Sequence, residues 1–420
     1  MALFIVLCML ALMLIGIPVF FTLGLTALFS VLLFDVTSLT QLAQSQFSGL
    51  NSFVLLAIPF FVLAGHVMVE ARLSPQLFDF MRSLTGWAPG GTAVGAGLAC
   101  GVFGAMTGSS AASSAALGGV VIPELDRCGY PRHFSAGLMA AGGTLAILIP
   151  PSIVFVIYAV MAGVSVTEIF KAAVVPGIMM TGLIVAVTVL LAWRNRWDIR
   201  IPFSGFGCLT AFLRAVPVLL MPFIVLGGIY SGVFTPTEAA AVSALYGILI
   251  GVFLYRNTSF STLLIIFRKS AVSTSTILVI VAQALLIGLL ATSAGIPASI
   301  LSIVNTAELQ AWQFLLIVNV VLIILGFFFD GVTILTVATP LLLPTVRELG
   351  IDLIHFGIIL TVNIEIASIT PPVGMNLFVI SSVSKTPIEQ IVRGVMPFLG
   401  VIVFALIIIT YVPAITFIYR

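Results

Sequence analysis

The second half of this chain repeats its first half at a fixed offset. Prolines, glycines and a glutamate recur 221 residues apart, in the pairs Pro123 and Pro344, Gly129 and Gly350, Pro150-Pro151 and Pro371-Pro372, Glu168 and Glu389, and Pro176 and Pro397. Chance matches would scatter over many offsets, so one common spacing indicates two copies of one unit. In each copy a double proline interrupts an apolar helix, a pattern typical of secondary transporters whose site lies between broken helices.

The residues around these prolines are apolar almost throughout. Of the 420 residues, 61% are hydrophobic and 7% are charged, whereas about a quarter of a soluble domain is charged. A membrane span needs roughly 20 apolar residues, and such stretches recur from Met1 to Tyr419. We therefore predict an all-α polytopic protein that lies in a lipid bilayer and has no soluble domain. No basic run suggests that the chain binds nucleic acid.

Hydropathy divides both copies into the same parts. The first copy, residues 1–205, has spans at 2–15, 17–34, 53–71 and 170–193, a hairpin at 92–121 and a broken helix at 135–162. The second copy, residues 206–420, has spans at 213–232, 237–255, 271–293 and 393–418, a hairpin at 313–346 and a broken helix at 355–382. If each hairpin returns to the side it entered, each copy crosses an odd number of times, so the two repeats are inverted.

The segments between spans leave two interpretations open. Residues 35–51, 72–91 and 256–270 are long enough for short amphipathic helices in the interface, or they are ordinary loops.

The basic residues predict the orientation. If the amino terminus lies outside, thirteen of the sixteen lysines and arginines face the cytoplasm, and only Lys171, Arg347 and Arg420 lie outside. Basic residues are enriched in cytoplasmic loops. We therefore predict a periplasmic amino terminus, with the first hairpin entering from the cytoplasm and the second from the outside.

The first hairpin carries a run of small and hydroxyl residues from Gly104 to Ser114. Such residues suit a re-entrant tip, which needs a tight turn and polar groups that satisfy its backbone. They also suit the packing face of closely spaced helices. The position of this run just before a broken helix favours a binding site.

The double prolines create binding groups in their helices. Each pair removes two amide donors, frees carbonyl oxygens and leaves a half-helix N-terminus inside the protein. Carbonyl oxygens suit a sodium ion, and a helix N-terminus suits a carboxylate. A kink that serves only packing is the alternative, but its presence in both copies favours a site. No lysine or arginine lies within 133–170 or 348–384, so a bound anion would depend on helix dipoles and co-bound cations.

Three acidic residues stand out because a buried charge in a membrane is costly. Asp330 lies at the second hairpin, Glu365 lies in the second broken helix, and apolar residues flank both. Asp330 is either a sodium ligand or a cap that fixes the hairpin tip. Glu238 follows Thr235-Pro236 and is either a functional acid or a helix-start residue.

Enzyme chemistry has little support. His66, His133 and His355 lie far apart without a serine and an acid in one motif, and no Walker A sequence is present. We predict that the chain is not an enzyme, with a polytopic membrane enzyme as a remote alternative.

At these residues the chain resembles the large membrane subunit of tripartite ATP-independent periplasmic (TRAP) transporters, which import C4-dicarboxylates, sialic acid and other organic acids. The similar motifs span nearly the whole chain: Gly49 to Phe53 with Ile58 to Phe61, Gly104 to Ser114, Ala141 to Thr144 with Ile149 to Ser152, Phe234 to Ala239, and Ile369 to Gly374.

The resemblance implies a sodium-coupled importer of an organic acid anion in the bacterial inner membrane. It implies an elevator mechanism, in which the hairpins and broken helices move against a scaffold. It also implies a periplasmic substrate-binding protein and a small four-helix membrane subunit, here expected as a separate chain, with no cofactor other than sodium as the coupling ion. A stand-alone divalent anion/sodium symporter, which works without a binding protein, is the alternative.

The candidate site residues follow from the tips and the breaks. For the substrate they are Ser109, Ser110, Thr144, Ser152, Thr333, Thr370 and Asn376. For sodium they are Gly108, Ser109, Gly143, Pro150, Asp330, Thr333, Glu365, Thr370 and Gly374.

Overall fold

A computed structural model describes residues 1–197 and 202–418, which form helices and no strand. The helices of the first half are α1 (Ala2–Leu14), α2 (Val19–Phe34), α3 (Leu39–Leu50), α4 (Ala57–Glu70), α5 (Ser74–Thr85), α6 (Gly91–Thr107), α7 (Ser110–Arg127), α8 (Arg132–Leu148), α9 (Ile153–Ala162) and α10 (Val166–Arg194). A 3₁₀ turn, Phe53–Leu56, precedes α4. The pair α6 and α7 forms the first hairpin, and α8 and α9 form the first broken helix.

The second half has the same order of parts. Its helices are α11 (Gly205–Tyr230), α12 (Pro236–Leu249), α13 (Phe260–Ser293), α14 (Ile296–Thr306), α15 (Ala311–Gly326), α16 (Gly331–Glu348), α17 (Leu353–Ile369), α18 (Met375–Ser384), α19 (Ile388–Tyr411) and α20 (Ala414–Phe417). A π-helical turn, Ile250–Leu254, extends α12. Thus α15 and α16 form the second hairpin, and α17 and α18 the second broken helix. The helical fold with two hairpins and two broken helices agrees with the prediction, whereas the division at 205/206 stays a prediction.

Seven of the described helical segments are long and apolar enough to cross a membrane. The first broken helix counts as one of them, as Arg132–Ala162. The helices α1 and α2 have only 13 and 16 residues, fewer than the roughly 20 of an ordinary crossing. The basic residues Arg200 and Arg420, used in the orientation argument, lie outside the described residues.

Two of the three intervening segments form separate amphipathic helices, and the third does not. Residues 35–51 contain α3 and residues 72–91 contain α5, as one of the two interpretations predicted. The prediction of a separate segment at 256–270 was wrong, because α13 runs unbroken from Phe260 to Ser293. The physical reason is that this stretch has no proline or glycine before Gly288, whereas the corresponding place in the first half has Gly49 and an extended Ser52.

Several helix ends also differ from the predicted spans. The first hairpin extends to Arg127, and α11 begins at Gly205, not at residue 213. The last long helix, α19, ends at Tyr411 rather than near 418, because Pro413 lies just beyond it and cannot continue the helix.

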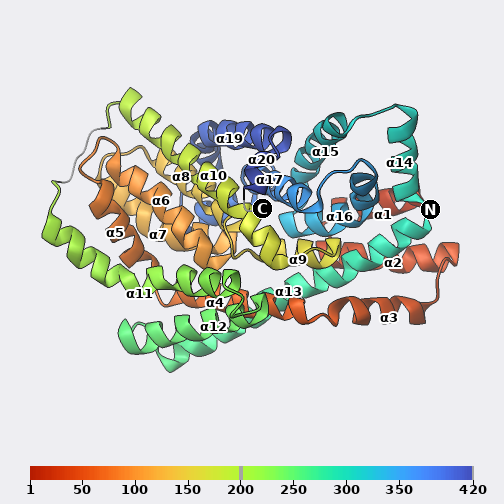
Figure 1. The fold of residues 1–420 in the computed structure, drawn as a ribbon, viewed down its shortest axis with the longest axis horizontal. Helices are drawn as coiled ribbons and strands as arrows, with labels where there is room; N and C mark the ends of the chain where they lie inside the picture. Colours follow the sequence, from red (N-terminus) through yellow and green to blue (C-terminus); the bar gives the residue numbers. More distant parts are fainter. Residues whose placement is uncertain (198–201, 419–420) are drawn as a thin grey trace.

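The helices are arranged in two layers in the view of Figure 1. The helices α3, α4, α11, α12 and α13 run along the lower side, with the two hairpins and broken helices above them. The long helix α13 packs against α2, α3 and α4 and also against α16, so it joins this lower layer to the second hairpin.

Each hairpin packs against both broken helices. The hairpin helix α7 lies against α8 of its own half and against α18 of the other half. In the same way α16 lies against α17 and against α9. This crosswise packing brings residues from the two halves together at the breaks.

Glycines permit the closest helix crossing. A Cβ on Gly394 in α19 would lie 1.8 Å from the His133 carbonyl oxygen, and one on Gly137 in α8 would lie 2.2 Å from the Gly394 carbonyl carbon. Nearby, Arg132 pairs with Asp126 and donates to the carbonyl oxygen of Ser384. The first half is thus tied to the end of α18.

Candidate substrate and ion site

The first hairpin tip presses against the first break. Gly108 ends α6 with φ +59°, a left-handed conformation, and its added Cβ would lie 2.9 Å from the carbonyl oxygen of Pro151. The next residue, Ser109, caps α7 by accepting from the amide of Ala112 at 3.4 Å. A glycine at position 108 therefore allows both the turn and the contact with the break.

The first break is buried and its hydroxyls bond locally. Thr144 donates to the carbonyl oxygen of Ala141 at 2.7 Å, and Ser152 donates across the break to the carbonyl oxygen of Ile147 at 2.6 Å. Both side chains are fully buried, as is the backbone around Pro150 and Pro151. Hydroxyl oxygens that donate in this way can still accept a hydrogen bond or bind a cation.

The first hairpin and the second broken helix meet at a polar cluster. The side-chain amide of Asn376 donates to the Ser110 hydroxyl at 2.6 Å and to the Ala140 carbonyl oxygen at 3.0 Å. Ser114 lies one turn beyond Ser110 and closes against Gly143, where an added Cβ would lie 1.9 Å from the Ser114 Oγ. We call these five residues, Ser110, Ser114, Ala140, Gly143 and Asn376, the hairpin-break junction.

The junction contains two oxygens that lack a partner. The Ser114 Oγ and the Asn376 Oδ1 are buried and make no hydrogen bond to any described residue. A buried acceptor without a donor costs about 1–3 kcal/mol. Because the amide nitrogen of Asn376 is already used, its remaining atom is an acceptor, and the Ser114 hydroxyl oxygen has lone pairs that can also accept, so both oxygens suit a cation.

The second break is more open than the first. Pro371, Pro372 and Val373 are exposed, whereas Pro150 and Pro151 are buried. Thr370 donates to the Ile366 carbonyl oxygen at 2.6 Å. Gly374 begins α18 with φ +24°, and its added Cβ would lie 2.9 Å from the Thr370 carbonyl oxygen. A ligand could therefore approach the N-terminus of α18.

At the second hairpin tip, Asp330 caps α16. Its carboxylate accepts from the amides of Val332 and Thr333 at 3.1 and 3.3 Å, and from the Thr333 hydroxyl at 2.5 Å. Beside it, Gly331 faces Ile364 of α17, whose Cγ2 lies 2.2 Å from the position of an added Cβ. These bonds show the capping arrangement that was one of the two predicted roles of Asp330. Glu238 likewise forms a capping box with Thr235.

The Glu365 carboxylate in α17 has no hydrogen-bond donor beside it among the described residues. Its side chain is fully buried, and neither carboxylate oxygen has a hydrogen-bond partner among the described residues.

Two residues earlier, Asn363 donates to the Asn319 Oδ1 at 2.8 Å, and Asn319 donates to the Thr410 hydroxyl at 3.0 Å. This chain of three polar side chains joins α17 to α15 and α19.

The structure brings only some of the predicted residues into contact. Ser110, Gly143 and Asn376 share the junction, Gly108 meets the first break, and Asp330 bonds Thr333. No hydrogen bond among the described residues links Asp330, Thr333 or Glu365 to the candidates of the first half. Sequence reasoning missed two residues as site candidates, Ser114 and Asn319. The sequence could have indicated Ser114, because it lies four residues after Ser110 and therefore on the same helix face.

Comparisons with known proteins identify the family of this chain. Residues 6–415 match the family described as "Tripartite ATP-independent periplasmic transporter, DctM component". The chain is similar to the C4-dicarboxylate TRAP transporter large permease protein DctM of Pseudomonas aeruginosa, with 43% identity over 94% of this chain and 92% of that protein. It is similar to the protein of the same name from Rhodobacter capsulatus, with 36% identity over 97% and 96%.

A third relative carries a different substrate name. The sialic acid TRAP transporter large permease protein SiaM of Vibrio cholerae is 32% identical over 96% of this chain and 94% of that protein. Among solved structures, the YdaH transporter of Alcanivorax borkumensis has the same fold, with a TM-score of 0.64, 13% identity and coverage of 88% of this chain and 87% of that one. These relatives are transporter components and not enzymes. The chain belongs to the family of DctM components of tripartite ATP-independent periplasmic transporters.

Proposed function

We propose that this protein is the large permease subunit of a sodium-coupled importer for an organic acid anion. Relatives named for C4-dicarboxylate and for sialic acid support an anion that bears a carboxylate. The family description, a tripartite periplasmic transporter, supports two further components. We assign these to a periplasmic substrate-binding protein and a small membrane subunit, which would work with this subunit at the bacterial inner membrane.

The hairpin-break junction carries the proposal of sodium coupling. Its unpartnered atoms, Ser114 Oγ and Asn376 Oδ1, are buried neutral oxygens, and carbonyl and hydroxyl oxygens at an unwound helix are the donors that bind sodium in transporters. We propose that carbonyl oxygens around Gly108 and Pro150 at the break, and around Gly143 where α8 meets Ser114, complete such a site. Glu365, Asp330, Thr333, Thr370 and Gly374 are proposed ligands or positioning groups on the second-half side.

The substrate carboxylate would bind at the broken helices. The half-helices α9 and α18 begin at the two breaks, and a helix N-terminus attracts an anion. The hydroxyls of Ser109 and Ser110 lie beside these ends and can donate to carboxylate oxygens. The hydroxyls of Ser152 and Thr370 and the amide of Asn376 would do so by exchanging their present hydrogen bonds. A sodium ion at the junction would favour the anion, because no basic side chain lies within the two breaks.

An elevator movement fits the packing. The hairpins and broken helices pack crosswise on one another, so they can move as one body. We assign the scaffold to the lower layer of Figure 1, with α4, α11, α12 and α13. The moving body would carry the site between the two faces of the membrane.

Ser114→Ala tests the sodium site. The variant removes an oxygen that bonds no described residue, so the fold loses little. We expect the sodium concentration for half-maximal uptake to rise about tenfold, since one lost ligand of about 1.4 kcal/mol corresponds to a factor of ten. The measurement is substrate uptake at graded sodium in vesicles that hold this subunit, the small subunit and the binding protein.

Thr188→Val is the matched control. Thr188 is also buried, but its hydroxyl donates within α10 to the carbonyl oxygen of Ile184 at 2.8 Å, so its loss should leave the sodium dependence unchanged. Uptake by the unaltered protein that ignores sodium would reject sodium coupling altogether. A normal sodium curve for Ser114→Ala would reject the junction as the ion site. Full uptake without the binding protein would favour the stand-alone symporter.

A further inference from the structure

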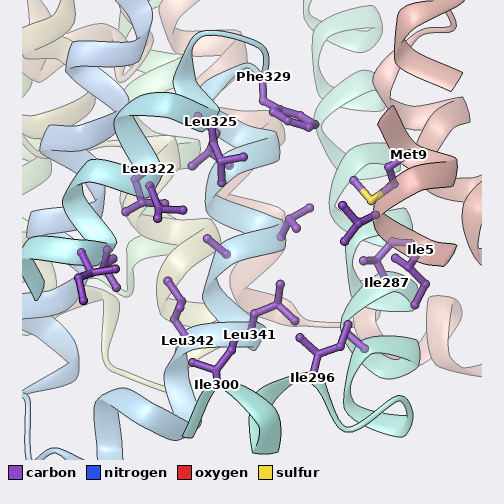
Figure 2. Close-up of a pocket in the computed structure, with 18 of the residues that line it drawn as sticks. Ile5, Met9, Ile287, Ile296, Ile300, Leu322, Leu325, Phe329, Leu341 and Leu342 are labelled. Carbon is purple, nitrogen blue, oxygen red and sulfur yellow. The ribbon is translucent and has the colours of Figure 1, made fainter. Parts of the chain in front are cut away.

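An apolar cavity lies between the second hairpin and the helices α1, α13 and α14. Its volume is about 520 Å³, within the roughly 300–1,000 Å³ of pockets that hold small molecules. One wall comes from α15 and α16, and the other comes from α1, α13 and α14. Figure 2 shows Phe329 at one end, Ile296 and Ile300 at the other, and Met9 and Ile287 on the wall that faces the hairpin.

The lining excludes a polar ligand. Every lining residue is apolar except Thr333, and the Thr333 hydroxyl is already bonded to Asp330. A water molecule or a carboxylate would find no partner here, because a buried water needs two to four polar groups. The apolar lining of the cavity therefore differs from the hairpin-break junction, whose residues carry hydroxyl and amide groups.

The cavity is continuous with an exposed apolar surface. Several of its lining residues are strongly exposed apolar side chains: Val6 and Leu10 on α1, Ile303 on α14, and Ile317 and Val321 on α15, with exposed fractions of 43–64%. In a membrane protein such a surface contacts lipid hydrocarbon. The opening of the cavity would therefore lie next to the acyl chains of membrane lipids.

The cavity is also elongated. Its lining on α16 extends from Thr333 to Leu342, ten residues of helix whose nine rises of about 1.5 Å span roughly 14 Å. An extended hydrocarbon chain matches an apolar space of this length better than a compact molecule does. Each methylene that enters contributes about 0.8 kcal/mol where it leaves water, and within a bilayer it replaces an empty space with packing contacts.

We propose that this cavity binds one acyl chain of a membrane phospholipid. The chain enters between α1 and α15, lies along α16 and fills the space that separates the second hairpin from α13 and α14. Its end lies beside Phe329, next to the hairpin tip that Asp330 caps.

Photolabelling tests the site in the full-length protein. The protein is placed in vesicles of phosphatidylethanolamine and phosphatidylglycerol that contain a lipid with a diazirine close to the ester end of its acyl chain, so that the reactive group lies at the end of the cavity opposite Phe329. We expect adducts on Ile300 and Leu341, inside the cavity, in addition to the general labelling of outward residues such as Phe404. Labelling of Phe404 without any at Ile300 or Leu341 would overturn the proposal, and no variant is needed for that result.

Two substitutions fill the cavity from opposite walls. Ala338→Trp projects from α16 and Ala291→Trp from α13, so one of them can report if the other does not fold. Either should lower the adducts on Ile300 and Leu341 about tenfold relative to Phe404, because the ring displaces several methylenes. Leu316→Trp, an exposed position of α15 outside the lining, is the control and should change nothing. Undiminished cavity adducts in a folded Ala338→Trp or Ala291→Trp protein would overturn the site.

A protein occupant is the competing outcome. A benzoylphenylalanine placed at Ile300 in the complex with the small subunit should form a lipid adduct. A crosslink from this position to a polypeptide would overturn the acyl-chain assignment.

Discussion

At the scale of single residues, the two acidic side chains Asp330 and Glu365 differ in the hydrogen bonds that they accept. Asp330 is half-buried and accepts three hydrogen bonds from Val332 and Thr333, which account for its charge at the start of α16. Glu365 is fully buried and accepts none from the described residues. Since an unpaired charge in a membrane is costly, Glu365 is the stronger candidate for direct contact with a cation, and Asp330 for holding the tip in place.

Asp330→Asn tests the role of the tip. The amide oxygen can still accept from the two backbone amides, but it loses the charge-assisted part of these bonds, which are about twice as strong as neutral ones. We expect a variant that assembles normally but needs about five- to tenfold more sodium for half-maximal uptake, a change of about 1–1.4 kcal/mol. Uptake at graded sodium measures it.

Asp352→Asn provides a cap with the same geometry outside the tip. Asp352 accepts from the amides of Ile354 and His355 at 2.9 and 3.0 Å at the start of α17, so its variant should leave the sodium curve in place. A normal curve for well-expressed Asp330→Asn would reduce Asp330 to an ordinary helix cap.

At the scale of helices, close packing depends on residues without side chains. Gly137 and Gly394 let α8 and α19 cross at backbone contact, and Gly143 admits Ser114 to the junction. Because the atoms opposite Gly137 and Gly394 belong to the backbone, they cannot rotate away from an added methyl group. This crossing therefore positions α8, which carries one side of the first break.

Gly394→Ala should destabilise the protein. Its methyl group would lie 1.8 Å from the His133 carbonyl oxygen, and overpacking of this kind typically costs about 1–3 kcal/mol. We expect a lower apparent unfolding temperature and less folded protein in detergent. Gly400→Ala on the same helix is the control, since no atom of the described residues lies within 4 Å of its added Cβ. Equal unfolding temperatures for the two variants would show that the crossing relaxes freely.

At the scale of the whole molecule, orientation in the membrane is still a prediction from charge. The thirteen-to-three distribution of basic residues predicts a periplasmic amino terminus and residues 296–312, with residues 72–91 and 194–212 on the cytoplasmic side. The helices α5 and α14 occupy corresponding places in the two halves, since adding 221 to the bounds 74–85 gives 295–306 and α14 spans 296–306. Inverted repeats should place them on opposite sides.

Single cysteines on these two helices test the orientation. Leu84 near the end of α5 and Glu308 just after α14 are both exposed, and the four native cysteines would first be replaced. In spheroplasts, an impermeant maleimide should label Glu308→Cys, and should label Leu84→Cys only after the membrane is opened. Labelling of Leu84→Cys in sealed spheroplasts would overturn the topology.

The sequence by itself determined the helical membrane class, the hairpins and the two breaks, because a double proline, a glycine turn and an apolar run act within a few residues of chain. The same local signals explain why α13 is continuous: nothing between Phe260 and Gly288 interrupts it. Only the tertiary structure decided which polar groups meet. The bond between Asn376 and Ser110 joins residues 266 positions apart. That the oxygens of Ser114 and Glu365 have no hydrogen-bond partner among the described residues is seen only when every neighbour is in place. Such contacts depend on how helices of the two halves cross, which no short-range pattern encodes.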